Sequence, residues 1–410
     1  MDSLPILKFG VNSNIILFKK FTEYKMTLAI ITHVPHIQEQ NHYFAYAPYV
    51  REMNIWINGV DKVILVAPKS IGTKAVIDLR YEHSNIEFIA IKSIDLLSLK
   101  GIFKTIVKIP KISWMLYKAM QQADHIHLRC PGNIGLIGCF VQIFFPKKTK
   151  TAKYAGNWDP RSKQPWSYRL QKWILSNTFL TRNMQVLVYG EWEGSSANIK
   201  PFFTASYSED VKLPIKVKKL EEQIGFIFVG TLVKGKNPLY SIQLVEKLSQ
   251  KGHSVKLMLY GEGTERETLE SYIAQNKLDN LISLEGNQTQ ETLINAYQTS
   301  HFVILPSESE GWPKAVAEGM FWGCVPIATR VSCVPFMLDQ GNRGLLLEMT
   351  QEHSSNWRSN LEKDVVQIEA LIHNELEFQS KSKNASDWSR KYTLDVFEEE
   401  IGKLLDVSRF

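Results

Sequence analysis

Residues 305–320 read LPSESEGWPKAVAEGM, and this stretch indicates the fold class of the chain. The residues just before it, 302–305, have the apolar, β-rich composition of a buried strand. Residues 313–322 have the spacing of a helix that stops at Gly323. A strand that runs through a polar loop into a helix is the repeating unit of a parallel α/β sheet.

The same alternation of strand and helix continues on both sides of this stretch. It predicts further strands at 226–229, 255–260, 281–284 and 325–328. It predicts a helix that begins at Pro238 and stops at Gly252, a helix at 265–277 behind a Thr264/Glu267 capping box, and a helix at 290–299. Parallel sheets bind ligands at the carboxyl ends of their strands. A site is therefore expected at the loops after Val229, Tyr260 and Leu305.

The composition indicates an ordinary soluble protein of about two domains. The chain has 410 residues, of which 44% are apolar and 22% are charged, and its formal net charge is +6. Its four cysteines form no Cys-x-x-Cys pair, which favours reduced thiols and a cytoplasmic location. The longest apolar run, residues 134–145, is too short to span a bilayer and suits a buried helix.

The N-terminal half shows a weaker form of the same pattern, with strands predicted at 27–31, 63–67, 86–91, 125–128 and 185–189. We therefore predict two Rossmann-like, doubly wound α/β domains, at residues 26–200 and 220–384, joined by a polar linker at 201–219. Residues 1–25 are expected to be an N-terminal extension, unless the native start is Met26. Residues 385–410 are expected to form an amphipathic C-terminal helix.

Two glutamates, with seven residues between them, flank the junction of strand and helix. Glu310 falls in the loop, and Glu318 falls on the second turn of the helix. The free N–H groups and partial positive charge of a helix N-terminus attract a diphosphate. A carboxylate close by accepts hydrogen bonds from sugar hydroxyls. The loop is thus suited to a ligand that carries both phosphate and polyol, and the alternative is a pair of solvated glutamates.

This Glu-x7-Glu pattern, followed by Gly323 and a small-Pro strand, resembles that of family 4 of the retaining GT-B glycosyltransferases. The resemblance is strong over residues 224–349 and weak before residue 200. It implies two domains facing each other across a cleft, with the donor in the second and the acceptor in the first. It implies that Glu310 lies beside the donor sugar and its leaving group, and that Glu318 binds the ribose. It also implies that the backbone after Glu310 holds the sugar and the distal phosphate, through Gly311, Trp312, Pro313, Lys314 and Ala315.

The loop that begins at Gly230 carries a second motif. In the family an Arg usually follows this glycine and a Lys stands five residues later, both facing the diphosphate. Lys236 matches the Lys, whereas Thr231 replaces the Arg. A Lys beside the leaving diphosphate stabilises charge that grows in the transition state, so Lys236 is a catalytic candidate. In the next loop, Gly261 and Gly263 either lie near the nucleotide or form a plain tight turn.

The N-terminal half offers candidates on the acceptor side. Many family members have two histidines at the position of residues 127 and 129, and the second faces the donor sugar. Here His127 matches the first, and Arg129 replaces the second. Arg129 cannot shuttle protons near neutral pH, but it could bind a sugar hydroxyl or a phosphate, so it is a third catalytic candidate. The alternatives are a His127 satisfied in the core and an Arg129 in a structural ion pair. His33 and His36 follow the first strand, where GT-B enzymes usually place a Gly-rich loop that is missing here.

Motifs of other phosphate chemistry are absent from the sequence. The chain contains no Asp-x-Asp, the pair with which GT-A enzymes hold a divalent ion on the diphosphate, and no P-loop. We therefore expect no metal and no cofactor, and a nucleotide-diphosphate sugar as co-substrate.

These observations predict a metal-independent, hexosyltransferase-like enzyme with a glycan or lipid-linked acceptor. The resemblance implies retention and a place in surface polysaccharide or lipopolysaccharide biosynthesis. A basic amphipathic stretch at 93–120, divided by Pro110, either touches the anionic inner face of the cytoplasmic membrane or is a core-facing helix with solvated lysines.

A nucleotide-sugar epimerase or hydrolase of the same fold, and a non-catalytic scaffold that binds a nucleotide sugar, stay open as alternatives. Nucleic-acid binding is not favoured, because the sequence contains no reader motif.

Overall fold

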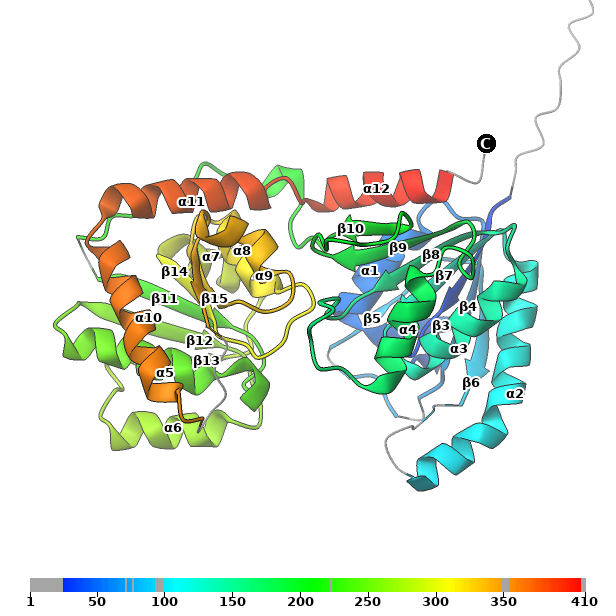
Figure 1. Ribbon diagram of the computed structural model, residues 1–410, viewed down its shortest axis with the longest axis horizontal. Coiled ribbons are helices and arrows are strands. Elements are labelled where there is room, and N and C mark those ends of the chain that lie inside the picture. Colours follow the sequence, from blue (N-terminus) through cyan, green and yellow to red (C-terminus); the bar gives the residue numbers. More distant parts are fainter. Residues whose placement is uncertain are drawn as a thin grey trace, which may run out of the picture.

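The computed structural model describes residues 25–406 except 71, 76, 93, 95–98, 222 and 349–353, and these residues form two α/β lobes (Figure 1). The predicted N-terminal extension, apart from Lys25, and several residues of the predicted basic stretch lie outside the described residues.

The N-terminal lobe is built on a seven-stranded parallel sheet with the order β10-β9-β8-β7-β1-β4-β6. Its strands are β1 (Thr27–Ile31), β4 (Lys62–Pro68), β6 (Ile86–Ile91), β7 (His125–Cys130), β8 (Thr149–Tyr154), β9 (Met184–Tyr189) and β10 (Ile199–Phe202). Helix α1 (Ala47–Ile57) packs on one face of the sheet. The other face is covered by α2 (Leu99–Gln122), α3 (Asn133–Val141) and α4 (Trp166–Ser176), with the short turn η1 (Gln142–Phe144). A small antiparallel sheet lies beside α1 and consists of β2 (Ile37–Glu39), β3 (His42–Tyr46) and β5 (Asp78–Arg80).

The C-terminal lobe has a six-stranded parallel sheet with the order β13-β12-β11-β14-β15-β16. Its strands are β11 (Ile224–Val229), β12 (Val255–Tyr260), β13 (Ile282–Gly286), β14 (Phe302–Leu305), β15 (Val325–Thr329) and β16 (Leu345–Leu347). Its helices are α5 (Pro238–Gln250), α6 (Arg266–Gln275), α7 (Gln290–Thr299), α8 (Lys314–Phe321), α9 (Val334–Met337), α10 (Trp357–Ile372) and α11 (Glu375–Ser389). Short 3-10 turns are η2 (Glu209–Val211), η3 (Lys234–Lys236) and η4 (Asp339–Gly341).

Each sheet reverses its direction of growth once. In the C-terminal lobe the chain passes from β11 through β12 to β13 and then returns to the other side of β11 as β14. In the N-terminal lobe the same reversal separates β1 from β7. Ligands of open parallel sheets bind where the connections diverge, beyond the carboxyl ends of the two strands. The residues that follow β11, β14, β1 and β7 are therefore placed by topology at the two switch points.

The fold confirms the predicted doubly wound architecture and departs from the prediction in detail. The strand β8 was not predicted, because its sequence TKTAKY contains Lys150 and Lys153, yet both lysines are buried. Helix α2 runs on through Pro110 as one helix rather than two. The predicted capping box does not form: Glu265 is the N-cap of α6, and no side chain caps it.

The expected C-terminal helix is two helices that serve different lobes. Helix α11 packs on α8 and ends at Ser389, and α12 (Leu394–Asp406) crosses to the N-terminal lobe, as Figure 1 shows in orange and red. There the ring of Phe397 lies 5.4 Å from that of Phe202 and 5.6 Å from that of Phe203. The side-chain amide of Asn58 also donates to Glu398 at 2.6 Å. Within the described ranges, no helix is both long and apolar enough to cross a membrane.

Candidate active site between the two lobes

The loops after β11 and β14 are fastened to each other at the switch point of the C-terminal sheet. Asn237 adopts a left-handed backbone conformation, with φ of 49°, and its side-chain amide donates to the carbonyl of Pro306 at 2.9 Å. The backbone N–H of Glu308 donates to the carbonyl of Gly235, also at 2.9 Å. These two bonds hold the loop that carries the predicted cation against the loop that carries the predicted carboxylate.

Lys236 and Glu310 meet at this point as an ion pair, with Nζ 2.5 Å from Oε1. Glu310 is buried and Lys236 is half-buried. The next residue, Gly311, lies against the opposite lobe, because a Cβ there would be 3.3 Å from the carbonyl oxygen of Ala155. The structure thus brings two of the three predicted catalytic residues together, at the border between the lobes.

The residues after Gly311 can reach a ligand in different ways. Trp312 is buried, with its ring 5.7 Å from that of Tyr189 and 6.0 Å from that of Trp388. Pro313 and Ala315 are also buried, so a donor-binding role for these three residues would rest on their backbone. Lys314, the first residue of α8, is exposed.

A cleft of about 1220 Å³ lies between the lobes, and both Lys314 and Glu318 line it. Its other walls come from α1, from the start of α7, from the connecting residues 204–208 and from α12. The carboxylate of Glu318 accepts two hydrogen bonds, from Ser206 Oγ at 2.7 Å and from the hydroxyl of Tyr297 at 3.2 Å. Burial and the charge of Glu318 raise the pKa of Tyr297 well above its ordinary value, so this hydroxyl remains a donor.

Arg129 forms an ion pair with Glu52 of α1. Of the two roles considered for Arg129 from the sequence, ligand binding or a structural ion pair, the structure shows the ion pair. The guanidinium donates to both carboxylate oxygens, at 2.5 and 3.2 Å. Lys153 adds a second cation, with Nζ 3.2 Å from the same carboxylate and 3.1 Å from the carbonyl of Phe203. Burial alone would raise the pKa of Glu52, but the charges and hydrogen bonds of its two partners outweigh burial and lower the pKa to about 2.

Sequence reasoning missed Glu52 and Lys153. Tyr49, Glu52 and Trp56 stand three and four residues apart on α1, which places the carboxylate on the buried face of that helix. That spacing was a usable signal for a buried acid. Its partner Arg129 lies 77 positions away, so the pairing itself carries no local signature.

Two of the three predicted acceptor-side histidines are core residues, which corrects that prediction. His127 is fully buried, contacts the ring of Trp56 at 4.1 Å between centroids, and has Nδ1 2.9 Å from Thr151 Oγ1. Burial lowers the pKa of His127 well below its ordinary value. His36 is also buried, with Nε2 2.8 Å from the hydroxyl of Tyr81, and burial lowers its pKa to about 4. His33 is exposed at the end of β1 and lies against Gly132, so it remains a candidate.

The two glycines after β12 allow close contact between two loop backbones. A Cβ on Gly261 would lie 2.0 Å from the carbonyl oxygen of Gly230, and a Cβ on Gly263 would lie 2.2 Å from that of Leu232. The N–H of Leu232 donates to the carbonyl of Glu262 at 2.9 Å. The glycines therefore let the loop that carries Thr231, which is exposed, rest on the neighbouring loop.

Replacing Gly263 by alanine is expected to lower the free energy of unfolding by about 2–3 kcal/mol, because the new Cβ forces two backbones apart. Urea denaturation measures this change. Gly235→Ala is the matched control, since nothing lies within 4 Å of a Cβ there. Equal stability of the two variants would contradict the close approach.

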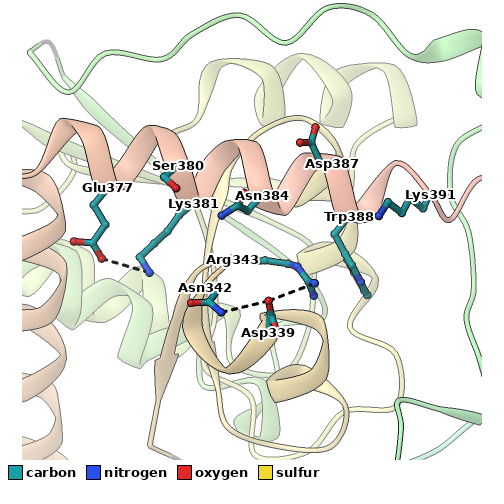
Figure 2. A pocket seen from close by; sticks show the side chains of 10 residues that line it. All are labelled: Asp339, Asn342, Arg343, Glu377, Ser380, Lys381, Asn384, Asp387, Trp388 and Lys391. Carbon is teal, nitrogen blue, oxygen red and sulfur yellow. Dashed lines mark hydrogen bonds and ion pairs between the residues drawn. The ribbon is translucent and has the colours of Figure 1, made fainter.

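A second, smaller cavity of about 530 Å³ lies in the C-terminal lobe between α11 and the residues around η4 (Figure 2). Arg343 and Trp388 point toward each other there, with the guanidinium 5.2 Å from the ring centre. Two ion pairs form within the lining of this cavity, Arg343 with Asp339 at 3.6 Å and Lys381 with Glu377 at 3.4 Å. None of the predicted site residues lines it. In the part of the chain that the structure describes, no group of three or more His, Cys, Asp or Glu residues is placed to hold a metal ion.

Proteins that resemble this chain in sequence or in fold include glycosyltransferases. Residues 212–362 match the family "Glycosyl transferases group 1". An uncharacterised glycosyltransferase of Methanocaldococcus jannaschii is 26% identical over 167 residues, which cover 41% of this chain and 43% of that protein. The chain thus spans less than half the length of the curated relatives it matches.

Solved structures of low identity share the whole fold. The Anabaena protein HepE in complex with UDP and glucose superposes with a TM-score of 0.62 and 12% identity, over 93% of this chain and 100% of that one. The lipopolysaccharide outer core galactosyltransferase WaaB, in its apo form, gives a TM-score of 0.63 and 14% identity, over 94% of this chain and 100% of that one. Residues 212–362, which carry Lys236, Glu310 and Glu318, therefore match the glycosyl transferases group 1 family, in a chain that has the GT-B fold.

Proposed function

We propose that this protein transfers a hexose from a nucleotide-diphosphate sugar to a glycan or lipid-linked acceptor, with retention at the anomeric carbon. The observation that carries the proposal is the meeting of Lys236 and Glu310 at the switch point, with Glu318 nearby on the wall of the cleft. The diphosphate requires a cation, which Lys236 supplies. The hydroxyls of the sugar and of the ribose require hydrogen-bond acceptors, which Glu310 and Glu318 supply.

The chemistry follows from the charges. The bond between the anomeric carbon and the diphosphate breaks, and a bond to an acceptor hydroxyl forms, so negative charge grows on the leaving diphosphate. Lys236 and the N-terminus of α8 supply positive charge there, which is the basis for proposing a metal-independent reaction. The proton of the acceptor hydroxyl leaves with the diphosphate product. We further propose that Glu318 binds the ribose hydroxyls, Glu310 contacts the donor sugar, and Arg129 orients groups on the opposite wall.

The donor, the acceptor and the setting are proposed by analogy. The fold is shared with a UDP-bound protein and with a lipopolysaccharide galactosyltransferase, which supports a UDP-sugar donor and a role in surface polysaccharide or lipopolysaccharide assembly. Nucleotide sugars are charged and do not cross bilayers unaided, so we place the reaction in the cytoplasm, at the inner face of the membrane where lipid-linked acceptors are exposed.

The first experiment is a thermal-shift screen against UDP, GDP, ADP and CMP in the presence of EDTA. A ligand at about 100 times its dissociation constant adds about 2.7 kcal/mol to stability and raises the melting temperature. We expect one diphosphate to do so, and Glu318→Ala to abolish its effect. The absence of a shift with every nucleotide would contradict the proposed donor site. Turnover of the matching nucleotide sugar without any acceptor would favour an epimerase or hydrolase. NMR of the product's anomeric proton tests retention.

Ser206 is expected to compete with the nucleotide for Glu318. In the structure Ser206 donates to this carboxylate, and ribose hydroxyls would take its place. Ser206→Ala should therefore tighten nucleotide binding by about 1 kcal/mol, or about fivefold, in calorimetric titrations. Ser208→Ala, two residues along, should leave the affinity unchanged. Weaker binding by Ser206→Ala would instead show that Ser206 orients the carboxylate.

A further inference from the structure

The cavity between α11 and η4 is lined almost entirely by polar side chains (Figure 2). Three of its lining residues are basic and three are acidic, so their formal charges cancel. They are Arg343, Lys381 and Lys391, and Asp339, Glu377 and Asp387. An anion in this cavity would meet three carboxylates, and a cation would meet two ammonium groups and a guanidinium group. The lining therefore suits a neutral ligand that offers many hydrogen-bonding groups.

The walls of this cavity are held in place by bonds within the protein. Lys381 Nζ reaches across from α11 and donates to the carbonyl of Gly341 at 2.6 Å. On the facing side, the guanidinium of Arg343 donates to the carbonyl of Met337 at 3.1 Å and lies 5.2 Å from the centre of the Trp388 ring. Because these side chains are already fixed, a ligand does not have to order them, which lowers the free-energy cost of binding.

Other side chains of the cavity are available to a ligand. Within the described ranges, the side chains of Ser380, Asn384 and Lys391 make no hydrogen bond or ion pair with the rest of the protein. Ser380 and Asn384 stand four residues apart on one face of α11, and Lys391 lies just past its end (Figure 2). A hydroxyl, an amide and an ammonium group together donate and accept hydrogen bonds, as the hydroxyls of a sugar require.

The length of helix that lines the cavity indicates a chain of sugars rather than a single one. The lining extends along α11 from Glu377 to Trp388, over about 16 Å of the helix axis, which is longer than one pyranose ring. Trp388 also packs on Trp312 of the donor-side loop, with ring centres 6.0 Å apart and planes at 25°. No residue that lines the cleft between the lobes lines this cavity, so the two are separate sites.

We propose that this cavity binds a neutral oligosaccharide, at a second carbohydrate site apart from the cleft. Hydroxyls of the sugar chain bond to Ser380, Asn384 and Lys391, and the charged groups of the lining present no net charge to it. The proposal rests on the proposed function in one respect, namely that the bound chain is a remote part of the acceptor or product glycan. A glycan held at this site stays close to the cleft, which raises the effective concentration of its reacting end.

Saturation-transfer NMR titrations of the purified full chain, without any donor, test the cavity. The neutral probes are maltohexaose, cellohexaose and chitohexaose, and the anionic probe is hexagalacturonate. We expect a neutral probe to bind, and to bind more tightly than hexagalacturonate. Ser380→Ala combined with Asn384→Ala should weaken this binding about 25-fold, or about fivefold for each lost hydrogen bond. Both residues are exposed on a helix, so the variant should keep the wild-type melting temperature.

The matched control is Ser254→Ala combined with Asn280→Ala, two exposed residues that line neither cavity. This variant and Glu318→Ala, which changes the cleft, should both bind the oligosaccharide as the wild type does. The proposal is overturned if no neutral probe binds, if hexagalacturonate binds more tightly, or if the cavity variant binds normally. It is also overturned if Glu318→Ala loses the binding, because the oligosaccharide would then occupy the cleft. The nucleotide thermal shift is measured separately, so failure of one proposal leaves the other untouched.

Discussion

Replacing Lys236 by alanine is expected to lower kcat by about 100- to 1000-fold, because it removes the cation beside the developing diphosphate charge. The ion pair with Glu310 places this ammonium group at the switch point, where both donor-side loops meet. The variant should remain folded, since Lys236 is half-buried and the contact between the loops runs through Asn237 and Gly235. Steady-state kinetics with the nucleotide sugar identified by the thermal-shift screen measures the effect.

Lys234 provides the matched control for Lys236. It belongs to the same 3-10 turn η3 but is exposed. Lys234→Ala should retain kcat within about twofold, as expected for a surface residue away from the reacting groups. If both alanine variants lost the same activity, the loop as a whole rather than the Lys236 ammonium group would be responsible.

Replacing Glu52 by alanine is expected to lower the free energy of unfolding by about 3–5 kcal/mol, because it leaves Arg129 and Lys153 without their shared anion in a buried setting. Chemical denaturation measures this loss. The control is Glu87→Ala, which removes a carboxylate from an exposed ion pair with Lys62 at 2.6 Å. Glu87→Ala should lower the free energy of unfolding by less than about 1 kcal/mol.

The Glu52 effect should also depend on pH in a defined direction. The folded-state pKa of Glu52, about 2, lies below its ordinary value of 4.5, so the ion pairs stabilise the protein fully above about pH 4.5. This stabilisation is lost as the pH falls from about 4.5 to about 2. The stability difference between wild type and Glu52→Ala should therefore shrink over that interval. A difference that stays constant with pH would show that Glu52 acts through packing rather than through its charge.

The C-terminal lobe could be predicted because its signals are local. Each strand is a short apolar run, and each is followed by glycine or polar residues and then by a helical pattern, so the sequence pattern alone locates the switch-point loops. The sequence placed the loops of Lys236 and Glu310 at one site, although the two residues are 74 positions apart, but it did not predict the ion pair between them. Because β11 and β14 are neighbours in a parallel sheet, their loops must meet.

The N-terminal lobe was harder to predict from the sequence, because the contacts that orient its polar side chains join residues far apart in the chain. The two lysines of β8 look solvated in sequence, but Lys150 Nζ donates to the carbonyl of Phe145 at 3.0 Å and Lys153 pairs with Glu52. His36 lies just before β2 and His127 lies within β7, and the side chains of both turn into the core. Position along a strand follows from the sequence pattern, whereas the direction of one polar side chain depends on packing partners from distant segments.

Helix α12 makes the N-terminal lobe discontinuous in sequence. The chain crosses between the lobes at residues 203–223 and returns at 390–393, and the crossings are tied together by the N–H of Leu394, which donates to the carbonyl of Tyr207 at 2.8 Å. Because the two connecting segments lie side by side, the lobes can rotate about the axis through both segments, but rotation about an axis perpendicular to it is resisted. An isolated fragment ending near residue 202 would also lack Phe397 and Ile401, which complete its own core. To express the N-terminal lobe as a separately folding protein, residues 391–406 therefore have to be fused to it.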